Sequence, residues 1–79
     1  MMSLSNCIRL IRKKALLTQD GFAEALQVSL VSVNRWETGR AIPNLKAMKA
    51  IKSFCIDNEL DYDLIEKEWL SERNNIDRR

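Results

Sequence analysis

The chain has 79 residues, of which 46% are hydrophobic and 30% are charged, and its net charge is +2. This length suits one small globular domain whose core is marginal, so a partner copy could complete it. Charges interrupt every apolar run, and none approaches the roughly 20 residues that a membrane span needs. The N-terminus, MMSLSNCIRL, lacks the order of a signal peptide. We therefore expect a cytoplasmic protein with no membrane contact.

The sequence lacks the combinations of residues that carry most catalytic and metal chemistry. There is no histidine, and Cys7 and Cys55 stand alone without a CxxC pair, which argues against a zinc site. No Gly-rich phosphate loop and no nucleophile beside a base can be assembled, so we predict no enzyme, no cofactor and no metal. Buried, reduced thiols are favoured over a redox role, and a Cys7–Cys55 disulfide stays open.

The first predicted element is an amphipathic helix that Ser5 can cap. Its apolar residues keep helical spacing and are Leu4, Ile8, Ile11 and Ala15. Its outward-pointing basic residues are Arg9, Lys13 and Lys14. This pattern indicates a helix that supports the elements that follow.

Residues 18–39 read as two short helices joined by a tight turn. Thr18 can cap the first, whose apolar stripe comprises Phe22, Ala23 and Leu26. Ser29 can cap the second, which ends at Gly39, a residue typical of helix C-termini. The segment predicts a helix-turn-helix.

The second of these helices has two different faces. Val33 and Trp36 share the side that should pack on the preceding helix. The opposite side carries Val31, Asn34, Arg35 and Thr38. An exposed helix with these groups and without acid fits the DNA major groove, which is wide enough for one helix.

Two further helices are predicted after a loop that ends at Pro43. Asn44 can cap the fourth helix, whose buried stripe would contain Leu45, Met48, Ile51, Phe54 and Cys55, with Lys46, Lys49 and Lys52 in solvent. A polar connector over 56–60 leads to a fifth helix at about 61–72, with an apolar edge of Leu64, Ile65 and Trp69. Tyr62 and Trp69 would either close the core or form a subunit interface. We predict that 73–79 is a flexible tail.

The string TQDGFAEALQVSLVSVNRWETGRAIP resembles the DNA-binding domain of the Cro/cI-type repressors, the XRE family of bacterial and phage regulators. The resemblance runs from about Ile8 to about Cys55. It implies an all-α, lambda-repressor-like bundle of about five short helices, a single domain over 1–72 with its core at 5–56. Two residues depart from the family pattern. Gln27 replaces the usual turn glycine and Gly21 lies inside a helix, each costing up to about 1 kcal/mol.

The helix faces and the resemblance together define candidate DNA contacts. Those expected at base edges are Ser29, Leu30, Val31, Asn34 and Arg35. Those expected at phosphates are Gln19, Ser32, Thr38, Arg40, Asn44 and Lys46. The structural residues are Val33, Trp36, Arg12 and Glu37, the last two forming an ion pair that the resemblance implies. Leu30 and Val31 cannot hydrogen-bond to bases and would instead contact thymine methyl groups.

Charge is unevenly distributed along the chain. Residues 1–54 carry a net charge of +6 and residues 55–79 a net charge of −4. This asymmetry fits a lobe that faces nucleic acid and a lobe that faces away. We predict a transcriptional regulator, a repressor, that binds an inverted-repeat operator as a homodimer with helix 29–38 in the major groove. The alternative is an antitoxin-like or anti-regulator module that binds a protein partner through its acidic C-terminal helix.

Overall fold

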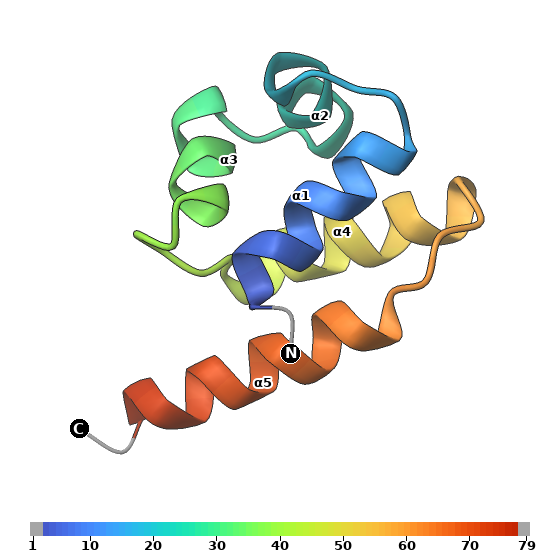
Figure 1. The fold of residues 1–79 in the computed structure, drawn as a ribbon. Helices are drawn as coiled ribbons and strands as arrows, with labels where there is room; N and C mark the ends of the chain where they lie inside the picture. Colours follow the sequence, from blue (N-terminus) through green and yellow to red (C-terminus); the bar gives the residue numbers. More distant parts are fainter. Residues whose placement is uncertain (1–2, 78–79) are drawn as a thin grey trace.

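Five helices and no strand make up residues 3–77, the part of the chain that the computed structural model describes, with side chains for residues 3–73 (Figure 1). The helices are α1 (Leu4–Lys14), α2 (Gln19–Leu26), α3 (Leu30–Glu37), α4 (Leu45–Asp57) and α5 (Asp63–Asp77). α1 lies at the centre and packs against both α3 and α5, while α2 packs against α3 and α4. The predicted all-α bundle is confirmed.

A polar side chain caps the N-terminus of each of the first four helices. In α2, α3 and α4 the caps are Thr18, Ser29 and Asn44, as predicted, and each side chain accepts an N–H from the first turn. The predicted cap of α1 is wrong, because Ser3 accepts the Asn6 N–H instead of Ser5 acting as cap. Starting the helix at Leu4 places that leucine in the core, where it is buried.

The same four helices also end alike, in a left-handed residue that closes a Schellman motif. These residues are Leu16, Gln27, Gly39 and Glu59, with φ between 55° and 75°. In each motif the N–H of the following residue bonds the carbonyl five residues back, as Val28 does with Ala23 at 3.0 Å. Only one of the four is the glycine that this conformation favours, so the other three carry backbone strain.

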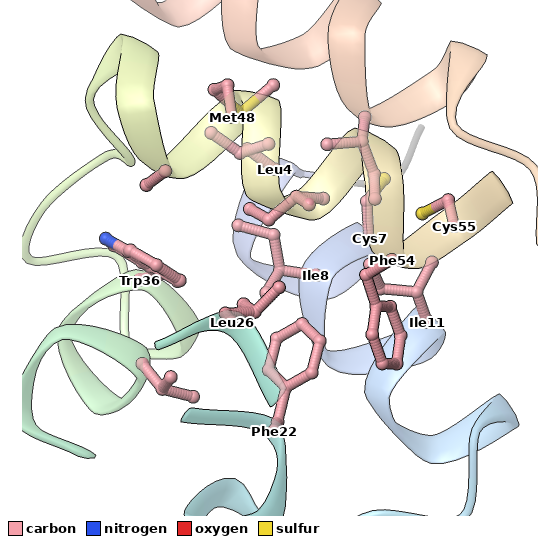
Figure 2. Close-up of a cluster of buried hydrophobic side chains, with 14 of the residues drawn as sticks. Leu4, Cys7, Ile8, Ile11, Phe22, Leu26, Trp36, Met48, Phe54 and Cys55 are labelled. Atoms are coloured by element: carbon pink, nitrogen blue, oxygen red, sulfur yellow. The ribbon is translucent and has the colours of Figure 1, made fainter. Parts of the chain in front are cut away.

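The core lies where α1, α2, α3 and α4 meet (Figure 2). Phe22 of α2 packs edge-on against Phe54 of α4, with ring centroids 5.2 Å apart. Cys7 and Cys55 are buried and unbridged in this core. Burial raises the pKa of the Cys55 thiol to about 11, so the thiol stays protonated and unreactive at neutral pH. Both cysteines therefore act as small apolar groups.

The structure corrects the predicted stripe of α4. Ala47, Met48, Ile51, Phe54 and Cys55 are buried, but Leu45 is 55% exposed. The buried face is centred near Ile51, and Leu45 lies about 120° around the helix from that direction at 3.6 residues per turn.

The predicted bounds of α5 are also wrong. The helix begins at Asp63, where the Asp61 side chain accepts the Asp63 N–H at 2.9 Å, and it continues to Asp77. Residues 73–77 are therefore helical and do not form a tail without structure, and 78–79 lie outside the described residues. The sequence after Asp63 contains no proline or glycine that would stop the helix earlier.

α5 closes the monomer's core through two side chains. Ile65 and Trp69 are buried, whereas Leu64 and Leu70 are exposed. The Trp69 indole N–H donates to the Pro43 carbonyl at 2.6 Å, which ties α5 to the loop between α3 and α4. Of the two roles considered for Trp69, the structure shows core closure.

Candidate nucleic-acid interface

α3 presents one buried face and one exposed face, as the sequence predicted. Val33, Trp36 and Glu37 are buried against α1 and α2. Val31, Asn34, Arg35 and Thr38 are exposed, and at about 100° per residue they lie on one side of the helix. The exposed side contains a single charge, Arg35, and no acid.

Glu37, at the end of α3, is the only buried charged residue in the described part of the chain. Its side chain is 1% exposed and receives a bidentate pair from Arg12, with N–O distances of 2.7 and 2.9 Å. This is the ion pair implied by the family resemblance. Gln19 Nε2 donates to the same carboxylate at 3.1 Å. The network joins α1, α2 and α3 at one point.

The pKa of Glu37 reflects two opposing effects. Burial alone would raise it, but hydrogen bonds from Arg12 and Gln19 and the charges of Arg12 and Arg9 outweigh burial and lower it below its ordinary value of 4.5. Arg12 also donates to the Leu17 carbonyl at 3.0 Å. The carboxylate is thus held ionised, and it fixes the angle between α3 and α1.

Arg9 is a member of this network that sequence reasoning missed. It was predicted to point outward, but its Nη2 donates to the Glu37 carbonyl at 2.7 Å and its Nε lies 3.7 Å from the carboxylate. A cation at the end of α3 complements the helix dipole. The available signal was its position three residues before Arg12, which puts both on one face of α1.

Gln19 links this network to the exposed face of α3. Its Oε1 accepts from Asn34 Nδ2 at 3.5 Å, a long contact, while its Nε2 binds Glu37. Gln19 therefore braces α3 from the first turn of α2. Asn34 is oriented by the contact and still exposed.

The first turn of α3 is apolar on its outer side. Leu30 is 44% and Val31 58% exposed. Ser29 accepts the Ser32 N–H and donates its hydroxyl proton to Ser32 Oγ, both at 3.0 Å. The hydroxyl proton of Ser29 is therefore occupied, whereas that of Ser32 is free to donate elsewhere.

A groove of about 490 Å³ lies between α3 and the start of α4. Four candidate DNA contacts line it together and are Ser32, Arg35, Asn44 and Lys46. Asn44 Oδ1 is already engaged, since it accepts the Ala47 N–H at 2.8 Å. Arg35 and Lys46 supply two cations, and Asn44, Lys46 and Ala47 at the start of α4 are among the lining residues. The groove can accept an anionic group such as phosphate.

The two remaining candidates lie at the end of α3. Arg40 is exposed in the loop that follows α3. Thr38 is exposed, and its hydroxyl donates to the Asn34 carbonyl at 2.8 Å, which leaves its oxygen as an acceptor. Thr38 is thus a weaker donor for phosphate than the sequence suggested.

This fold and this site define a helix-turn-helix protein. A family described as helix-turn-helix matches residues 8–55, well over half of the chain. The chain belongs to the Cro/cI-type (XRE) helix-turn-helix family of DNA-binding transcription regulators, with its lambda-repressor-like all-α fold.

A similar protein is the HTH-type transcriptional activator BcrR of Enterococcus faecalis, 34% identical over 53 residues. The match covers 67% of this chain and 26% of that protein, so the chain spans about a quarter of the relative's length. No solved structure matches the chain significantly. Among the described helices, none is both long and apolar enough to cross a membrane.

Proposed function

We propose that this protein binds double-stranded DNA sequence-specifically by inserting α3, with its cap at Ser29, into the major groove. The proposal rests on the exposure of one face of α3 while Glu37 anchors the opposite side to α1. The exposed face consists of Val31, Asn34, Arg35 and Thr38. A major groove about 12 Å wide admits one such helix. The anchor means that the helix meets DNA at a fixed angle.

Phosphate contacts position α3 on the duplex. Ser32, Arg35, Asn44 and Lys46 share the groove beside α3. The other phosphate candidates include Gln19, in the first turn of α2, and Arg40, which is exposed after α3. Arg35 lies at the border between the exposed face of α3 and the groove that α3 forms with α4. Its side chain can therefore contact either a guanine edge in the DNA major groove or a phosphate. Contacts to phosphate fix register, and contacts to base edges carry sequence information.

Alanine substitution separates the two roles of Arg35. Arg35→Ala costs about 1–3 kcal/mol and relaxes preference at one base pair if the guanidinium binds guanine. If the guanidinium binds phosphate, the substitution weakens binding to all sequences alike and lowers the slope of log affinity against log salt concentration by about 1. Lys67→Ala, an exposed cation on α5, is the matched control and should leave affinity unchanged. Unchanged affinity in Arg35→Ala would exclude Arg35 from the site.

The functional unit on DNA is a symmetric dimer on an inverted repeat. One helix contacts too few base pairs to select a site among a genome's competitors. Two-fold symmetry puts half-site centres about 10–10.5 base pairs apart. Because Ile65 and Trp69 are used inside the monomer, the interface is proposed at exposed apolar side chains of the start of α4 and of α5, which include Leu45 on α4 and Leu64 and Leu70 on α5.

Sedimentation of the complex with a selected operator tests the dimer. A 2:1 complex is expected, and 1:1 binding to an asymmetric site at saturating protein would contradict it. Leu45→Glu and Leu64→Glu, compared in parallel, identify the interface as the one whose substitution yields monomers.

Repression by occupying a promoter is the regulatory outcome that we propose, because occlusion needs only the DNA-binding surface. A reporter placed behind the selected operator should lose expression when the protein is present. Increased expression would instead show activation, which is the role that the name of the Enterococcus relative gives to that protein.

Binding of a protein partner by α5 is the second candidate function. The exposed side of α5 carries acidic residues, Asp63 and Glu66, together with apolar ones, Leu64 and Leu70. The negative charges of DNA phosphates would repel the two carboxylates. Salt-sensitive retention on DNA and heparin supports the first function. A stable complex with a co-purifying protein, without DNA affinity, supports the second.

A further inference from the structure

The outer side of the first turn of α3 has an unusual chemistry for a surface that reads base pairs. Val31 lies in the middle of the exposed face, between Asn34 and Arg35, and Leu30 lies at its edge on the side of Asn34. Both are substantially exposed, at 58% and 44%. Two apolar side chains are thus exposed to solvent in the first turn of α3, the part of the helix that would approach the bases in the DNA major groove.

The polar groups of the first turn are not available for hydrogen bonds to bases. Ser29 caps the helix and donates its hydroxyl proton to Ser32. Ser32 lies toward the groove that α3 forms with α4, on the side proposed for phosphate. Base reading by the first turn is therefore left to Leu30 and Val31.

The major groove presents one apolar group, the C5-methyl of thymine, and the other pyrimidine that carries it is 5-methylcytosine. We infer that the first turn of α3 recognises the C5-methyl group of a pyrimidine. Because the methyl is the group contacted, binding discriminates thymine from uracil and 5-methylcytosine from cytosine. This inference rests on the proposed insertion of α3 into the major groove.

Burial of one methyl against an apolar side chain predicts the size of the effect. A buried CH₂-sized group contributes about 0.8 kcal/mol, which corresponds to about fourfold in affinity. Each half-site with one such contact should therefore lose about fourfold when the methyl is removed. A symmetric operator with both methyls removed should lose about sixteenfold.

The test uses the full chain and an operator obtained by binding-site selection. Each thymine is replaced in turn by uracil, which removes only the methyl, and affinity is measured by fluorescence anisotropy. We expect about a fourfold loss at one or more thymines of the half-site. At the same position, 5-methylcytosine should bind about fourfold more tightly than cytosine.

Variants assign the contact to the protein side chains. Val31→Ala and Leu30→Ala should bind thymine and uracil operators with more nearly equal affinity, because the apolar partner of the methyl is lost. Ile56→Ala removes a side chain that is 65% exposed near the end of α4 and should keep the full discrimination. Alanine favours the helix, and circular dichroism checks that each variant is folded.

The outcomes separate this inference from the function on which it rests. Selective binding that is indifferent to uracil at every half-site thymine, or a selected half-site without thymine, overturns methyl recognition and leaves the DNA-binding function intact. Discrimination that persists unchanged in both Val31→Ala and Leu30→Ala also overturns it. Failure to select any sequence overturns the proposed function itself.

Discussion

Two buried contacts hold α3 and α5 to the rest of the molecule in different ways. α3 is fixed at Glu37 by directional bonds from Arg12 and Gln19, made to a carboxylate that is 1% exposed. α5 is fixed by the apolar burial of Ile65 and Trp69, with one hydrogen bond to Pro43. Directional bonds set an angle, whereas apolar area sets only closeness. The helix that we propose reads DNA is the one held by directional bonds.

Breaking the network at Glu37 should have the largest effect on stability. Arg12→Ala leaves a buried carboxylate with only Gln19 and Arg9 as partners, and it should destabilise the protein by about 3 kcal/mol in urea denaturation. Lys13→Ala, an exposed neighbour on α1, should change stability by less than about 0.5 kcal/mol.

A double variant shows whether the charge itself causes the loss. Arg12→Met with Glu37→Met removes both charges, so it should be more stable than Arg12→Ala alone. Its α3 would then be held by packing, as α5 is, and DNA selectivity should decline even where folding recovers. Retained selectivity would argue that the network does not set the angle of α3.

Weakening the contact of α5 should have a smaller effect. Trp69→Phe removes the N–H that binds the buried Pro43 carbonyl and part of the buried area, which should cost about 2 kcal/mol in the same denaturation experiment. Leu70→Ala, at a side chain 47% exposed, is the control. Folded Trp69→Phe should bind DNA as the natural chain does, and a selective loss of DNA affinity would contradict the separation of the two regions.

Lowering the pH should affect α3 and α5 differently, because the pKa of Glu37 on α3 is lowered and that of Glu72 on α5 is raised. The lowered pKa of Glu37 means that its ionised form stabilises the fold above pH 4.5, and this contribution disappears as the pH falls below 4.5 through the folded-state pKa. Burial, then the charge of Glu68, raises the pKa of Glu72 on α5. The contribution of protonated Glu72 is therefore present below pH 4.5 and is lost as the pH rises through its folded-state pKa.

Thermal denaturation at several pH values measures this contrast. The stability advantage of the natural chain over Glu37→Gln should shrink on acidification below pH 4.5. Its stability relative to Glu72→Gln should instead improve as the pH falls toward 4.5. Parallel pH profiles for the two variants would refute the assigned pKa directions.

Relieving backbone strain at the turn between α2 and α3 should have the smallest effect. Gln27 has a φ of 58°, so Gln27→Gly should stabilise the protein by about 1 kcal/mol. Gly21→Ala, in the interior of α2, should add about 0.5–1 kcal/mol, because the new Cβ meets nothing closer than 3.4 Å. Calorimetric melting temperatures measure both, and a decrease for Gln27→Gly would show that its side chain stabilises the turn.

Local features of this chain were predictable and tertiary ones were not. Thr18, Ser29 and Asn44 were identified as caps because a cap bonds an N–H within three residues. Leu45 was misplaced because the direction of the core from α4 depends on where the other helices lie. Arg9 was missed for the same reason, since its partner is the carbonyl that ends α3, 28 residues away.

The bounds of α5 show a further limit of the sequence. The stretch SERNNIDRR has one apolar residue in nine, which suggested a tail. It contains no proline or glycine that would stop a helix, and the structure continues α5 to Asp77. The two faces of α3 were predicted more fully, because helical periodicity alone separates the buried Val33 and Trp36 from the exposed Asn34 and Arg35. The groove shared by α3 and α4 required the structure, since it depends on how the two helices pack.

We propose above all that α3 contacts DNA while α5 does not. Backbone amide shifts of the ¹⁵N-labelled full chain, measured during titration with a selected operator duplex, test this most directly. We expect the largest changes over residues 29–38, with further changes at Gln19 and at the start of α4, and little change at Ile65 and Trp69. The largest changes on α5, with α3 unaffected, would contradict the account.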